Sequence, residues 1–176
     1  MISRLTQSVL TVHPRVRRPK FWIVLFVSTL ALASIAVSIL TRYRIGVSNE
    51  SEQSVGSAWT LVSLHKGPVE VGKYGVFVTD RRVKLFPAGT EFVKLIVGAP
   101  GDLVHVGARA TTVNGVVVAG PLDSLGALGL TADKVETTFI LAPGDFFAVG
   151  TRPHSYDSRY WGPVHVEQFV GTASLL

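Results

Sequence analysis

The sequence contains no cysteine among its 176 residues. This absence excludes a disulfide framework, a thiolate metal site and a cysteine nucleophile. Charged residues are also scarce, at 16% against 47% hydrophobic residues, which argues against a disordered chain or a nucleic-acid-binding tail. The net charge of +5 arises at the N-terminus, where five of the 17 basic residues lie within 20 positions: Arg4, Arg15, Arg17, Arg18 and Lys20. We therefore expect no nucleic-acid partner.

Familiar metal and cofactor motifs are missing as well. The five histidines show neither HxxH nor HExxH spacing, which argues against zinc, and there is no glycine-rich phosphate loop. His154 and Asp157 lie near several serines, but no GxSxG turn accompanies them, so a Ser-His-Asp triad is poorly supported. The sequence predicts neither a metal nor a cofactor.

Residues 21–40 form one long apolar run without charge, Pro or Gly. A helix of this length, at about 1.5 Å per residue, spans the roughly 30 Å hydrocarbon core of a bilayer. A cleavable signal peptide is the alternative, but its apolar core is usually only about 7–15 residues long. Because basic residues are concentrated before the run, the positive-inside rule predicts a basic cytoplasmic segment over 1–20, a transmembrane helix over 21–41 and an extracytoplasmic domain over 42–176.

The remaining chain has short apolar runs separated by turn signals, the pattern of a mainly β, antiparallel domain. Asn114-Gly115 is a strong hairpin signal, because both residues tolerate a positive φ. Residues 121–134 lack strand character and predict a loop with a short helix. The expected strands cover residues 59–65, 74–79, 92–98, 103–107, 115–120, 138–142, 145–150 and 166–171.

Lys94 is unusual because it lies inside an apolar strand, FVKLIVG. Such a lysine either extends its amine to the surface or is buried and loses its proton. A neutral lysine can act as general base for a serine hydroxyl, which makes a Ser-Lys dyad the sharper hypothesis. The polar stretch after the apolar run, residues 46–58, supplies four candidate serines, none of which stands out by composition alone.

Two segments resemble the bacterial type I signal peptidase family of serine-lysine proteases. Residues 155–164, SYDSRYWGPV, match a block of that family and follow its Pro-Gly-x-Phe-Phe strand, here Pro143 to Gly150. Residues 93–102, VKLIVGAPGD, are similar to the block that holds the catalytic lysine. The resemblance implies a signal-peptidase-like β domain in which Lys94 is the base, Ser155 orients it, and Asp157 and Arg159 form a bracing ion pair.

A third segment of the resemblance bears on the nucleophile. The family's serine box lies just after the membrane anchor, and Ser54-Val55-Gly56-Ser57 fits it in part. The small size resembles the TraF-type branch of conjugative transfer peptidases, where a Gly-hydrophobic pair lies about eight residues before the nucleophile, as Gly46 does before Ser54. This implies Ser54 as nucleophile, with Ser57 and Ser51 as alternatives. Because Glu52 stands where the family places a hydroxyl donor, the oxyanion hole is expected to use the backbone N–H of Ser54.

The expected protein is a serine endopeptidase in the bacterial inner membrane, with its N-terminus in the cytoplasm and its catalytic domain in the periplasm. Its expected substrate is a membrane-bound, exported precursor, of the pilin type in conjugative transfer, bound as an added strand along residues 92–98. A general leader peptidase and a non-catalytic component of a secretion channel are the alternatives.

Overall fold

The computed structural model describes residues 19–47, 54–65 and 67–176. The chain divides into two compact units, one that ends at Thr41 and one that comprises residues 42–176. Helix α1 (Pro19–Arg42) lies in the first unit except for its last residue. It covers the residues for which the sequence predicts a transmembrane helix. This helix is long and apolar enough to cross a membrane. Thr29, Ser34 and Thr41 direct their hydroxyls to helix carbonyls one turn earlier, so that these polar groups are satisfied within the helix.

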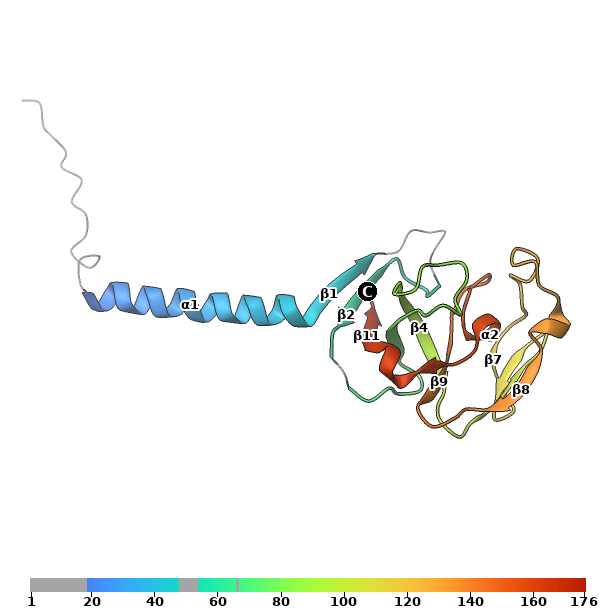
Figure 1. The fold of residues 1–176 in the computed structure, drawn as a ribbon. Helices are drawn as coiled ribbons and strands as arrows, with labels where there is room; N and C mark the ends of the chain where they lie inside the picture. Colours follow the sequence, from blue (N-terminus) through green and yellow to red (C-terminus); the bar gives the residue numbers. More distant parts are fainter. Residues whose placement is uncertain (1–18, 48–53, 66) are drawn as a thin grey trace, which may run out of the picture. The chain divides into compact units, whose positions relative to one another are not determined.

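The second unit consists of two antiparallel sheets (Figure 1). The larger sheet has the strand order β1-β2-β11-β3-β4-β9-β10, and the smaller one β7-β6-β5-β8. The larger sheet contains β1 (Tyr43–Val47), β2 (Trp59–Ser63), β3 (Tyr74–Val78), β4 (Glu91–Gly98), β9 (Asp145–Val149), β10 (Val164–His165) and β11 (Phe169–Leu175). The smaller sheet contains β5 (Leu103–Val106), β6 (Thr111–Val113), β7 (Val116–Ala119) and β8 (Thr137–Ile140). The predicted mainly β, antiparallel class is confirmed.

Local sequence signals account for most of these elements. Asn114 and Gly115 both have positive φ, at 50° and 81°, and join β6 to β7 as the predicted hairpin. The predicted loop over 121–134 contains the 3-10 helix η3 (Ala132–Lys134). Three strands escaped prediction, namely β1, β6 and β10. The predicted strand over 166–171 is shifted, because residues Val166–Gln168 form the 3-10 helix η4 and the strand begins at Phe169.

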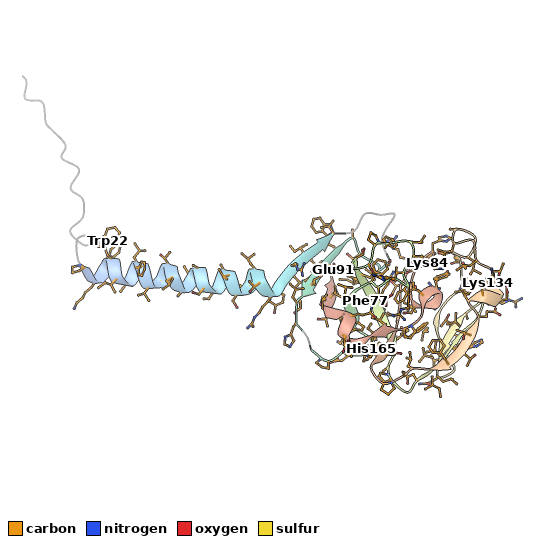
Figure 2. All side chains as sticks on the ribbon, viewed as in Figure 1. Trp22, Phe77, Lys84, Glu91, Lys134 and His165 are labelled. Atoms are coloured by element: carbon orange, nitrogen blue, oxygen red, sulfur yellow. The ribbon has the colours of Figure 1, made fainter. Side chains whose placement is uncertain are left out.

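Two apolar clusters hold the unit together, and β9 contributes to both. Phe146 and Ala148 join the first cluster, whereas Phe147 and Val149 join the second, as the alternation of a strand requires. Phe77 lies inside the first cluster (Figure 2), where its ring contacts those of Phe92, Trp161 and Phe169. The second cluster contains inward-facing residues of β5 and β6, including Val104, Val106 and Val113. Since β9 is held on both faces, its C-terminal end is a firm support for the residues that follow it.

Candidate active site

Lys94 lies in the middle of β4 and is buried, with 1% of its surface exposed. It shares its face of the strand with Phe92 and Ile96, and the Phe92 ring centroid lies 5.3 Å from its Nζ atom. Burial lowers the pKa of Lys94 to about 8, while Asp157 acts to raise this pKa and Arg159 to lower it. The alternative of a surface lysine is wrong, because the strand places the amine inside the domain.

Ser155 is the hydrogen-bond partner of this amine. The Lys94 Nζ atom donates to Ser155 Oγ over 2.9 Å, although the two residues are 61 positions apart in the sequence. Ser155 is itself buried and follows the C-terminal end of β9, which pairs with β4. The pairing of these two strands therefore brings the predicted lysine and the predicted orienting serine together.

The predicted ion pair between Asp157 and Arg159 is confirmed. Arg159 donates from Nε to Asp157 Oδ1 and from Nη2 to Oδ2, both over 2.8 Å, in a bidentate arrangement. The same carboxylate accepts from the backbone N–H of Gly150 over 2.8 Å and caps helix α2 (Ser158–Trp161) through the N–H of Arg159. Both side chains are almost completely buried. Asp157 is thus engaged by Arg159 and by backbone rather than by His154, which gives a Ser-His-Asp triad no support.

The predicted nucleophile, Ser54, lines a cleft of about 790 Å³ together with Lys94 and Ser155. The backbone N–H of Thr151 donates to the carbonyl of Ser54 over 2.8 Å and ties the serine segment to the end of β9. Apolar residues of four strands form much of the cleft wall: Val47, Val62, Val76, Phe92 and Val93. The three residues that the sequence singled out therefore meet at one cleft.

The two alternative nucleophiles predicted from the sequence, Ser57 and Ser51, do not line the cleft or lie outside the described residues, respectively. Ser57 Oγ lies 2.9 Å from the carbonyl oxygens of both Trp59 and Leu176, at the end of β11, and it does not line the cleft. Ser51 lies outside the described residues, as does Glu52 at the predicted oxyanion position. The geometry of the described serines favours Ser54 over Ser57.

Gly150 is a functional residue that the sequence reasoning missed. A Cβ atom at this position would overlap with Ser155 Oγ and would lie 2.7 Å from the carbonyl oxygen of Ser54. Only glycine allows the segments that carry Ser155 and Ser54 to approach so closely at this position. Its place directly after a strand, five residues before the polar block that begins at Ser155, was the available signal. A close approach between two segments cannot be recognised from the order of residues alone.

The edge at which a substrate strand was expected is partly occupied. Residues 92–98 were predicted as an open edge, but Leu95, Ile96 and Gly98 pair with β9, while Glu91 to Leu95 pair with β3 on the other side. Among the residues that the structure describes, no strand pairs with Glu91–Lys94 on the side of β9. The open edge is therefore shorter than predicted and ends beside the Lys94 amine.

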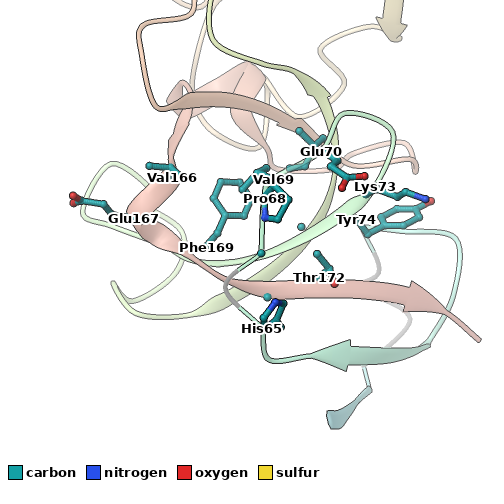
Figure 3. A pocket seen from close by; sticks show the side chains of 14 residues that line it. His65, Pro68, Val69, Glu70, Lys73, Tyr74, Val166, Glu167, Phe169 and Thr172 are labelled. Carbon is teal, nitrogen blue, oxygen red and sulfur yellow. The ribbon is translucent and has the colours of Figure 1, made fainter. Parts of the chain in front are cut away.

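A second cavity of about 320 Å³ lies on the face formed by β3 and β11 (Figure 3). Figure 3 shows Phe169 next to Pro68 and Val69, with Glu70 and Lys73 at the rim. None of Ser54, Lys94 and Ser155 lines this cavity. The cleft that contains Lys94 is therefore the candidate active site, and the second cavity is not, because it lacks these three residues.

An antiparallel β domain with a buried lysine bonded to a serine is typical of serine peptidases that use lysine as general base. The signal peptidase family, peptidase S26, matches residues 19–176. The chain therefore belongs to this family of serine peptidases, and the family predicted from the sequence blocks is confirmed. The TraF-type branch stays a prediction.

The chain is also similar to individual proteins. The chain is 34% identical over 110 residues to a probable signal peptidase I-2 from Synechocystis sp., which covers 59% of this chain and 46% of that protein. It is 25% identical to a signal peptidase I from Bacillus caldolyticus, over 83% of this chain and 84% of that one. A solved signal peptidase I from Enterococcus faecalis V583 is similar with a TM-score of 0.42 and 21% identity, over 61% of this chain and 98% of that one. The match thus spans about half the length of the Synechocystis relative.

The close approach at Gly150 yields a prediction. The substitution Gly150→Ala should lower kcat/KM by about 100-fold, because the added methyl group must displace either Ser155 or the Ser54 carbonyl by a large part of an ångström. The measurement is cleavage of a precursor peptide in detergent micelles. Gly126→Ala is the matched control, since its Cβ meets nothing within 4 Å and should leave the rate unchanged. Equal rates for both variants would contradict the close packing of the site.

Proposed function

We propose that this protein is a membrane-anchored serine endopeptidase that cleaves exported precursor proteins with a Ser54-Lys94 dyad. The observation that carries the proposal is the buried Lys94 amine, held 2.9 Å from Ser155 at a cleft that Ser54 also lines. A lysine in such surroundings is neutral in a substantial fraction of molecules near pH 8, which a general base requires. A non-catalytic channel component would have no need for a lysine kept in this state.

The proposed reaction has two steps. The neutral amine of Lys94 takes the proton of Ser54 as its Oγ attacks the scissile carbonyl carbon, and the resulting ammonium returns this proton to the leaving amine as the C–N bond breaks. Water then hydrolyses the acyl-enzyme, with Lys94 again as base, and releases the carboxylate product. Ser155 accepts a hydrogen bond from Lys94 and keeps the amine at the cleft. The backbone N–H of Ser54 is the proposed oxyanion donor.

Substrate binding is proposed at the free stretch of β4. An extended peptide can pair with Glu91–Lys94 on the side that β9 leaves open, and its scissile bond then lies next to the lysine. Much of the cleft wall is apolar, while Arg44 pairs with Glu91 over 3.5 Å at the start of the strand. We expect small residues at the cleavage site, since the backbone of the substrate has to approach a closely packed site.

The proposed location is the inner membrane of a bacterium. Helix α1 has 24 residues and contains an 18-residue window with a mean hydropathy of 2.6. Five basic residues lie in the first 20 positions, which favours a cytoplasmic N-terminus and a periplasmic β domain. Strand β1 begins at the residue directly after α1, and its Ile45 and Val47 are each 63% exposed, beside Trp59 at 54%. Exposed apolar side chains on the strand that directly follows a membrane helix in the sequence are suited to the bilayer interface.

This enzyme has two candidate substrate classes. The small size of the domain and the spacing from Gly46 to Ser54 support a pilin precursor in conjugative transfer, through the resemblance to the TraF-type branch. A general signal peptidase is the second candidate, favoured by the relatives from Synechocystis sp. and Bacillus caldolyticus, both described as signal peptidase I.

The pH dependence of cleavage tests the base. Because the pKa of Lys94 is lowered to about 8, kcat/KM should rise about tenfold per pH unit below pH 8 and level off above it, as the amine loses its proton. Lys94→Ala should abolish cleavage, and Lys94→Arg should do the same, since a guanidinium stays protonated. The measurement is the rate of peptide cleavage from pH 6 to pH 10. Activity in Lys94→Arg would show that Lys94 is not the base.

Alanine substitution of the serines tests the nucleophile. Ser54→Ala should lower the rate by several orders of magnitude, because serine and base act as one unit. Ser57→Ala and Ser51→Ala should cost about tenfold or less, through changes of loop packing. The measurement is precursor processing at matched membrane levels of each variant. A normal rate in Ser54→Ala together with an inactive Ser57→Ala or Ser51→Ala variant would show that another serine is the nucleophile of the dyad. Normal rates in all three variants would refute the Ser-Lys dyad.

A substrate panel decides between the two classes. Purified full-length enzyme should cleave a pilin precursor at least about tenfold faster than a precursor with an ordinary secretory signal peptide, when both are presented in the same detergent micelles. The reason is that the short serine segment and small domain leave less surface to bind varied precursors. Lys94→Ala enzyme is the control for contaminating peptidases. Faster cleavage of the secretory precursor would identify a general signal peptidase.

A further inference from the structure

The connection between β7 and β8, residues 120–136, reaches the block that contains Ser155. Arg159 donates from Nη1 to the carbonyls of Pro121 and Gly120, over 3.1 and 3.4 Å. Ser124 Oγ donates to the carbonyl of His154 over 3.0 Å. These contacts join residues that are 30 to 39 positions apart in the sequence. One of the residues contacted, His154, directly precedes Ser155.

His154 has an unusual backbone, with a φ of 61°. Among the described residues only Asn114 shares a positive φ without being glycine, and Asn114 lies in a hairpin turn that calls for it. A left-handed residue with a Cβ atom is strained, so it persists only where its surroundings hold it. At His154 the carbonyl that Ser124 binds belongs to the peptide group shared with Ser155. The orientation of this peptide sets the direction in which the Ser155 side chain leaves the backbone.

Ser124 is well placed to fix that peptide. Its side chain is buried, and its own backbone N–H donates to the Tyr160 hydroxyl over 3.0 Å. Tyr160 packs on Tyr156, with ring centroids 5.8 Å apart. The segment 154–160 therefore contacts Ser124 twice, through the Tyr160 hydroxyl at its backbone N–H and through the His154 carbonyl at its side chain. These two contacts leave the Ser124 hydroxyl little freedom to move away from the His154 carbonyl.

We propose that Ser124 is a positioning residue that keeps His154 left-handed and thereby aims Ser155 at the Lys94 amine. The inference rests on the proposed function, because it concerns the residue that orients the base. Without the Ser124 hydroxyl, His154 can relax to a negative φ and turn the peptide that precedes Ser155. The Lys94 amine then loses its fixed partner, while the substrate-binding edge of β4 stays intact.

The first experiment compares Ser124→Ala with matched variants, using an alanine-rich fluorogenic precursor peptide in detergent micelles. Ser124→Ala should lower kcat about tenfold and leave KM unchanged within about twofold, because an orienting residue is lost and the binding edge is not. Ser124→Thr keeps a hydroxyl and should retain the wild-type kcat. Glu136→Ala is the control, since it removes a 2.8 Å bond from the same connection to the N–H of Ala108, away from the site. A Ser124→Ala enzyme that behaves like Glu136→Ala would overturn the proposal.

The second experiment tests whether Ser124 acts through the strained backbone of His154. His154→Gly makes the left-handed backbone accessible without the hydroxyl, so the loss of kcat from Ser124→Ala should shrink from about tenfold to about twofold in that background. An undiminished loss would overturn the proposal, because a merely structural role of Ser124 does not depend on the residue at 154. If Ser124→Ala fails to fold, Tyr160→Phe removes only the hydroxyl that holds Ser124 and should lower kcat in the same direction.

The same assay distinguishes a failure of the proposed dyad from a failure of the proposed positioning role of Ser124. Wild-type cleavage by Lys94→Ala would refute the proposed dyad itself. Loss of cleavage in Lys94→Ala together with unchanged kcat in Ser124→Ala would leave the dyad intact and refute only the positioning role.

Discussion

The burial of a single amine governs the arrangement of this site. Lys94 belongs to an apolar strand, and its buried Nζ atom lies near the Phe92 ring with the Ser155 hydroxyl as its partner. A carboxylate nearby would ordinarily keep such a lysine protonated. Here Arg159 binds the Asp157 carboxylate through two N–H groups and supplies a compensating positive charge. The ion pair therefore braces the block and also limits the charge that reaches the amine.

The support for this arrangement comes from β9. Its side chains alternate between two apolar clusters, which fixes the strand on both faces. The chain then turns at Gly150, whose N–H binds Asp157 and whose missing side chain leaves room for Ser155 and the Ser54 carbonyl. The core and the site are thus directly connected, because the residue that follows the core strand is also the one at which the Ser155 and Ser54 segments approach each other.

The success of sequence-based prediction varied with the range of the interactions involved. The Asn114-Gly115 hairpin and the strands around Phe77 and Phe147 were predicted because their signals are local, namely turn propensity and apolar runs. Strand β1 was missed although Tyr43, Ile45 and Val47 alternate, since its exposed residues gain their place only by pairing with β2. The open edge over 92–98 was wrong in part for the same reason: which strand pairs with Leu95 is a property of the sheet.

The sequence by itself determined the chemistry that is possible. It placed a lysine in an apolar strand, serines in a polar segment after a long apolar run, and a dense polar block that identifies the family. Those features depend on residue type and spacing alone. Only the tertiary structure decided that Lys94 and Ser155 touch across 61 positions, that Ser54 lines their cleft while Ser57 ties down Leu176, and that Ser124 holds the peptide before Ser155. Contacts of this kind follow from strand order and register, which are set by the packing of the whole domain and are not encoded in any short segment.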